Sequence, residues 1–131
     1  MDTSRRVVVA EDNPNLRKVI VNIVRKLGFK EVQETEDGED AWEIVEDGGI
    51  GLVLADWSMP TTSGLDLLKR IRGASDEAIR EIPFLMITAK DTKDSIVNAG
   101  KHGVDAYVIK PFSVKTIEEK IQEALDNRAA Q

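Results

Sequence analysis

Short runs of strand-forming residues alternate with helical segments five times along this chain, and this alternation constrains the fold more than any other feature. The expected strands are residues 7–10, 31–35, 52–55, 84–87 and 107–109. Four runs are apolar, as expected for parallel strands covered on both faces, and the more polar second run is typical of an edge strand. Right-handed crossovers then favour an α/β fold with a doubly wound parallel sheet and helices on both faces. A closed barrel of eight such units would need roughly 250 residues.

Caps and apolar spacing mark the helices between these strands. Asn13 and Pro14 supply a capping side chain and a proline at the start of the first helix, and Gly28 can end it. The fourth helix, residues 91–99, is weak, and only residues 127–131 should follow the last one. No linker is visible, so we expect a single domain over residues 1–131 with no output domain. The side chains expected to be buried are Leu16, Val19, Ile20, Ile23, Val24 and Leu27, then Ala41, Ile44 and Val45, then Leu65, Leu68 and Ile71, and finally Val114, Ile117, Ile121, Ala124 and Leu125.

Composition excludes several functional classes. The 131 residues are 41% hydrophobic and 32% charged, with 24 acidic against 18 basic side chains and a net charge of -6. This acidic balance disfavours binding to nucleic acid. Without cysteine, the chain has no disulfides, thiolate metal sites or cysteine nucleophiles. Its apolar stretches are too short for a membrane span or a signal peptide, so we expect a cytoplasmic protein that does not bind membranes.

Reactive side chains follow four of the five expected strands. Glu11 and Asp12 come after the first, Asp56 after the third, Thr88 after the fourth and Lys110 after the fifth. Because the carboxyl ends of parallel strands meet at one rim of the sheet, where ligands bind, these side chains should converge. Each alone would be an ordinary solvated loop residue, but the shared placement predicts a site.

The predicted site has the chemistry of metal-assisted phosphoryl transfer. Clustered carboxylates repel one another unless a cation neutralises them, and Mg²⁺ prefers oxygen ligands and bridges carboxylates to phosphates. Glu11, Asp12 and Asp56 are the candidate ligands, and Mn²⁺ should substitute. Lys110 and Thr88 could hold phosphoryl oxygens, while an oxygen of Asp56 attacks phosphorus to give an aspartyl phosphate.

The same positions resemble the response-regulator receiver family, and most closely its stand-alone chemotaxis members. The resemblance extends from the first strand to the last helix. It implies the flavodoxin-like strand order 2-1-3-4-5. The residues that carry it are Glu11-Asp12-Asn13, Asp56-Trp57-Ser58-Met59-Pro60 with Gly64, Thr88-Ala89, and Tyr107 with Lys110-Pro111-Phe112.

The resemblance also implies roles for these residues. Asp56 would be the phosphoacceptor, with the backbone carbonyl of Ser58 as a further metal ligand beside the acidic pair. Thr88 and Lys110 would contact the phosphoryl group, and Tyr107 would be the switch aromatic that moves inward when Thr88 is drawn to the phosphate. The Lys110-Pro111 bond would be cis.

Two positions depart from the chemotaxis pattern. Ser58 stands where the chemotaxis protein has asparagine, and Lys90 stands where it has glutamate. Both flank the path of an attacking water, so neither the dephosphorylation rate nor the response to a phosphatase transfers from those relatives.

The favoured function is therefore a two-component response regulator that is not a turnover enzyme. Its expected partners are a sensor histidine kinase, a downstream target such as a flagellar motor component or another signalling protein, and a phosphatase. The face formed by residues 91–122 should change on phosphorylation. One alternative is an Mg²⁺-dependent aspartyl-phosphate phosphohydrolase, although Ser58 occupies the place of the second aspartate of such enzymes. A second alternative is a flavodoxin-like cofactor binder, but this chain has no Gly-rich phosphate-binding turn after its first strand. A third is a docking module that is never phosphorylated, but such a module would not need the complete acidic site.

Overall fold

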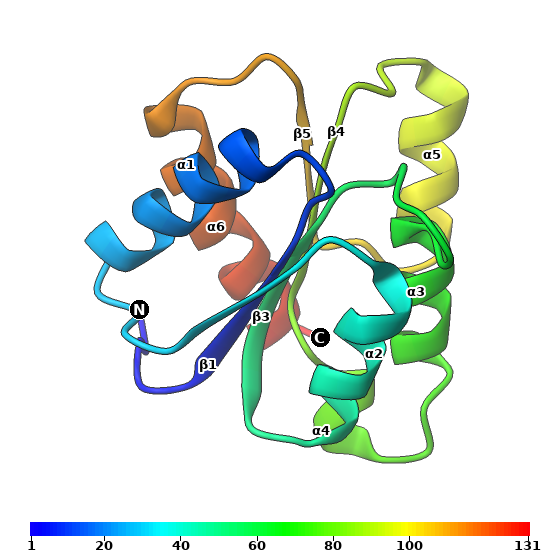
Figure 1. Ribbon diagram of the computed structural model, residues 1–131. Helices are drawn as coiled ribbons and strands as arrows, with labels where there is room; N and C mark the ends of the chain where they lie inside the picture. Colours follow the sequence, from blue (N-terminus) through cyan, green and yellow to red (C-terminus); the bar gives the residue numbers. More distant parts are fainter.

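Five parallel strands form the centre of the computed structural model, which describes all residues, 1–131. The strands lie in the order β2-β1-β3-β4-β5, as the resemblance implied. This arrangement confirms the predicted doubly wound, flavodoxin-like sheet (Figure 1). The strands are β1 (Arg6–Ala10), β2 (Val32–Thr35), β3 (Ile50–Ala55), β4 (Phe84–Thr88) and β5 (Ala106–Ile109).

Helices cover both faces of this sheet. α1 and α6 lie on one face, and α2, α3 and α5 lie on the other (Figure 1). Asn13 caps α1, as predicted, because its side chain accepts hydrogen bonds from the first N–H groups of the helix. Ser113 caps α6 in the same way. The helices are α1 (Pro14–Lys26), α2 (Gly38–Glu46), α3 (Gly64–Arg72), α4 (Glu77–Arg80), α5 (Lys93–Lys101) and α6 (Val114–Ala129).

The sheet separates two apolar layers. In β1, Val7 and Val9 point into the layer beneath α1 and α6, whereas Val8 and Ala10 point into the layer beneath α2 and α3. Side chains alternate between the faces of a strand, so an unbroken apolar run supplies both layers. Burial on both faces thus explains the apolar runs of the sequence.

Several sequence expectations require correction. Val19 and Val114 are 45% and 52% exposed, although apolar spacing placed both on buried sides. The buried side of α1 is turned toward Val21 instead, and α6 reaches the core only from Ile117 onward. The short helix α4 was not predicted, β3 begins at Ile50, and α6 continues to Ala129. No helix has the length and apolar character that crossing a membrane requires.

A buried ion-pair network joins the elements at the amino ends of β4 and β5. The Asp105 carboxylate accepts hydrogen bonds from Arg72 Nη2 at 2.7 Å, Arg128 Nε at 3.0 Å and the Phe84 N–H at 2.8 Å. Arg72 also donates to the carbonyls of Arg80 and Ile82. Burial lowers the pKa of Arg72 to about 10 despite the nearby carboxylate. The network ties the ends of α3 and α6 to the sheet.

Candidate functional site

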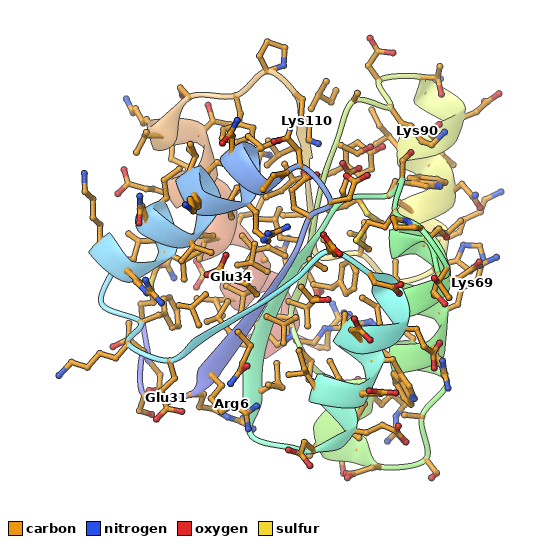
Figure 2. All side chains as sticks on the ribbon, viewed as in Figure 1. Arg6, Glu31, Glu34, Lys69, Lys90 and Lys110 are labelled. Carbon is orange, nitrogen blue, oxygen red and sulfur yellow. The ribbon has the colours of Figure 1, made fainter.

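The predicted site residues lie at the carboxyl rim of the sheet. Figure 2 shows Lys110 at this rim, with Arg6 and Glu31 at the opposite end of the molecule. Glu11, Asp56 and Lys110 each stand one residue beyond the end of a strand. The backbone N–H of each still donates to the last residue of the neighbouring strand, at 2.9, 3.0 and 2.9 Å respectively. The sheet therefore fixes where each of these side chains begins.

Three carboxylates and one ammonium group form the centre of the site. Glu11, Asp12 and Asp56 each offer an oxygen, and these oxygens lie within 4.8 Å of one another. Lys110 Nζ lies 2.7 Å from Glu11 Oε1 and 2.5 Å from Asp56 Oδ2. The side chains of Glu11 and Asp56 are only 2% and 8% exposed, while Asp12 is exposed. One ammonium group cannot neutralise three carboxylates, so two negative charges remain.

Burial and charge shift the pKa values of this cluster. Burial raises the pKa of Glu11, and the charge of Asp56 adds to the effect, although hydrogen bonds from Lys110 and Asn13 oppose it. For Lys110, burial alone would lower the pKa, but the hydrogen bonds and charges of Asp56 and Glu11 outweigh it and raise the pKa. Lys110 thus stays protonated and holds the two carboxylates together.

Backbone groups orient the buried carboxylates. The Asn13 N–H donates to Glu11 Oε2 at 3.1 Å, and the Ser58 N–H donates to Asp56 Oδ1 at 3.1 Å. The loop after Asp56 also packs against Gly64, where an added Cβ would lie 2.1 Å from the Asp56 carbonyl oxygen. Only glycine permits this close approach, so the loop and the start of α3 are held directly beside Asp56.

Thr88 and Tyr107 are connected to each other through Lys90. Thr88 is buried, and its Oγ1 accepts the Lys90 N–H at 3.3 Å. The Tyr107 hydroxyl donates to the Lys90 carbonyl at 2.8 Å. Burial, aided by the charges of Asp56 and Asp91, raises the pKa of Tyr107. No hydrogen bond joins the Thr88 side chain to the carboxylates.

Comparison with known proteins agrees with this geometry. The family description "Response regulator receiver domain" matches residues 7–122, which is most of the chain. The chain belongs to this family. Membership of this family supports a role for the protein in two-component signalling.

Relatives of known sequence include chemotaxis proteins. The chain is 35% identical to chemotaxis protein CheY-3 of Vibrio cholerae, over 96% of this chain and 95% of the relative. It is also 35% identical to chemotaxis protein CheY of Pseudomonas aeruginosa, over 92% of this chain and 96% of that protein.

Solved structures of receiver domains share the fold. The receiver domain of a Pseudomonas aeruginosa sensor histidine kinase, which has a magnesium ion coordinated in its active-site cleft, superposes with a TM-score of 0.81 at 26% identity. That match covers 94% of this chain and 98% of the other. A CheY-like receiver protein of Methanospirillum hungatei has a TM-score of 0.84 at 23% identity, covering 97% and 98% of the two chains, and this likeness concerns the fold.

The structure brings Glu11, Asp12, Asp56 and Lys110 into one receiver site, as the rim rule predicted, and places Thr88 and Tyr107 beside it. The Lys110-Pro111 bond is cis, as the resemblance implied. Sequence reasoning missed Arg17, whose Nη1 donates to the Glu11 carbonyl at 2.7 Å. Nothing in the helical spacing distinguished that arginine from a solvated one.

Proposed function

We propose that this receiver domain accepts a phosphoryl group on Asp56 from a sensor histidine kinase, in a reaction that depends on Mg²⁺. The observation that carries the proposal is the position of the Asp56 carboxylate, which lies beside Glu11 and Asp12 and is bound by Lys110. The related receiver domain with a coordinated magnesium ion adds support.

The residues at the rim fit a hard divalent cation. Carboxylate oxygens are the ligands that Mg²⁺ prefers, and the two uncompensated negative charges of the cluster match its charge. Glu11, Asp12 and Asp56 would hold the ion together with the backbone carbonyl of Ser58, and Mn²⁺ would substitute. The bound ion would neutralise charge on the transferring phosphoryl group.

The chain's own groups supply the remaining steps. A carboxylate oxygen of Asp56 forms the bond to phosphorus as the bond from phosphorus to the donor histidine nitrogen breaks. Lys110 can turn from the carboxylates to a phosphoryl oxygen, and the Thr88 hydroxyl can donate to another. The protein would thus promote its own phosphorylation and dephosphorylation without acting as a turnover enzyme.

The output face would be formed by α5, β5 and α6, over residues 91–122. Exposed apolar side chains support this assignment, because Ile96, Val97 and Ile109 are 37%, 44% and 39% exposed there. Thr88 and Tyr107 reach this face through Lys90. A phosphoryl group adds about 1.5 to 2 negative charges, enough to shift a two-state equilibrium whose forms differ by a few kcal/mol.

The partners follow from this mechanism. A cytoplasmic histidine kinase domain would supply the phosphoryl group, and a phosphatase would act on the phosphorylated form. The 35% sequence identity to each of two chemotaxis proteins favours a chemotaxis role. The target would then be a flagellar motor component or another signalling protein.

Mass spectrometry after incubation with acetyl phosphate and Mg²⁺ tests the phosphoacceptor. We expect one phosphoryl mass on the wild type and none on Asp56→Ala, with Asp66→Ala as a matched control because Asp66 is exposed at the start of α3. Persistent labelling of Asp56→Ala would refute the assignment. Continuous release of phosphate from other phosphate esters would indicate the phosphohydrolase instead.

Hydrogen exchange with and without beryllofluoride, which mimics the phosphoryl group, tests the output face. We expect changed protection from Lys90 to Tyr107. Changes confined to the loop after Asp56 would show that the signal leaves by another face.

A further inference from the structure

β2 forms one edge of the sheet, and the outer side of its backbone is unpaired. The strand pairs with β1 alone, and Glu31 and Thr35 turn their carbonyl groups toward that neighbour. Because successive residues of a parallel strand turn their backbone groups to opposite sides, the N–H and C=O groups of Val32 and Glu34 point away from the sheet. α1 and α2 lie on either side of this edge (Figure 1), and no hydrogen bond from either helix reaches those groups.

A groove of about 700 Å³ follows this edge and carries excess negative charge. Five carboxylates and two arginines are among its ten lining residues, so three negative charges are in excess. One arginine, Arg17, is already paired with Glu34 at 3.3 Å. The other four carboxylates are exposed and form no ion pair. They belong to Glu36, Asp40, Glu43 and Asp47.

Three of these carboxylates form a stripe along α2. Asp40, Glu43 and Asp47 are spaced by three and four positions, so they share one side of the helix over about 10 Å. The group of three acidic residues whose oxygens come within 4.8 Å of one another is the receiver site, so the stripe is too spread out to hold a metal ion. Side chains on one side of an extended chain repeat every 7 Å or so, about the spacing that the stripe requires. The groove therefore matches several positive charges on an extended polypeptide.

We propose that the edge of β2 binds an extended, basic segment of a partner protein as an added strand. The backbone of the segment bonds to the outward groups of Val32 and Glu34, and lysine or arginine at every second position faces the acidic stripe of α2. A second copy of this chain is a poorer occupant, because it would bring the same excess negative charge to the contact. The inference does not depend on phosphorylation of Asp56.

The probe is a fluorescein-labelled peptide with five lysine-threonine repeats, and fluorescence anisotropy measures its binding to the full chain. We expect Glu43→Lys to weaken binding about fivefold, because an exposed ion pair is replaced by a repulsion. Glu46→Lys is the matched control, since Glu46 is exposed on the same helix but does not line the groove. Its effect should stay below about twofold, because salt screens the more distant charge.

Glu34→Pro tests the addition of a strand. Proline removes the outward N–H and leaves the bonds to β1, since an edge strand tolerates proline where the N–H faces solvent. Compared with Glu34→Ala, which loses the same side chain, the affinity should fall by a further factor of about three to ten, the effect of one hydrogen bond. In the wild type, the N–H groups of Val32 and Glu34 should exchange more slowly with solvent when the peptide is bound.

Several outcomes would overturn the proposal. No binding of the probe, or equal binding of a glutamate-threonine peptide, would refute the match of charges. Equal effects of Glu43→Lys and Glu46→Lys would show that net charge, and not the groove, attracts the peptide. Unchanged exchange at Val32 and Glu34 would exclude an added strand, and a dimer that Glu34→Pro dissociates would mean that a second copy covers the edge. Labelling of Asp56 is measured separately, so the two proposals fail independently.

Discussion

Replacing Asp105 with alanine measures how much the buried ion-pair network, which lies far from the receiver site, contributes to the free energy of unfolding. The Asp105 side chain is 3% exposed, and its two arginine partners, Arg72 and Arg128, are 13% and 12% exposed. Alanine would leave Arg72 without a carboxylate partner and Arg128 with only the half-exposed carboxylate of Glu81. It would also leave the Phe84 N–H without its acceptor. Removing one partner of a buried ion pair costs about 3–5 kcal/mol. We therefore expect the free energy of unfolding to fall by that amount.

The expected loss can be expressed as a melting temperature. An unfolding entropy of about 2.1 cal/mol/K per residue, for 131 residues, gives about 0.28 kcal/mol/K for the chain. A loss of about 3–5 kcal/mol then lowers the melting temperature by roughly 11–18 °C. Calorimetry without metal measures this directly. Phosphorylation of Asp56 well below the transition should persist, since Asp105 lies at the other end of the sheet.

Asp126→Ala is the matched control for this change. Asp126 is exposed on the same helix as Arg128, and its carboxylate accepts one hydrogen bond, from the Gln122 side chain at 2.9 Å. Surface substitutions of this kind usually change stability by less than about 0.5 kcal/mol. If the melting temperature of Asp105→Ala lies within about 3 °C of the wild type, the free energy of unfolding has fallen by less than about 1 kcal/mol. The reasoning from burial would then be wrong.

Three further predictions concern the site and its surroundings. Calorimetric titration with Mg²⁺ should show that Asp12→Ala lowers the affinity by more than about tenfold, a loss that even supporting residues of metal sites can cause; unchanged affinity would mean that the ion binds elsewhere. Burial raises the pKa of Tyr107, the one tyrosine, so the midpoint of the rise in phenolate absorbance should lie at a higher pH than for an ordinary tyrosine, which titrates at about pH 10. The folded chain then binds the phenol proton of Tyr107 more tightly than the unfolded chain does. The stability that this difference contributes is complete below about pH 10 and is lost as the pH rises further. A phenolate midpoint at the ordinary tyrosine value would contradict this prediction. Gly64→Ala should destabilise the protein by about 1–3 kcal/mol in denaturant and reduce labelling of Asp56, because the new Cβ meets the Asp56 carbonyl; wild-type values for both would refute the argument from close approach.

Strand positions and the rim of the sheet could be predicted because both depend on local patterns. A buried parallel strand is apolar along its whole length, and the residue after it must reach the carboxyl rim. Glu11, Asp56 and Lys110 were located by this rule alone. The order of the strands and the cis bond at Lys110-Pro111 came from the family resemblance, since no local pattern encodes them.

Other features depend on how distant segments meet. Val19 has the spacing of a buried residue, but the orientation of α1 on the sheet decides which side is covered. Asp105 precedes a strand, where an acidic residue would ordinarily be solvated, and only the ends of α3 and α6 supply its arginines. The contact of Lys90 with Trp57 likewise joins loops more than thirty positions apart, which helical or strand spacing cannot detect.

The division of the core into two layers has an evolutionary consequence. A substitution beneath α1 and α6 meets the layer beneath α2 and α3 only through the backbone of the sheet, because the side chains of each layer pack among themselves. Distant sites that share no partners contribute to stability almost additively. One side of such a protein can therefore acquire new helix surfaces, and with them new partners, while the packing of the other side is inherited unchanged.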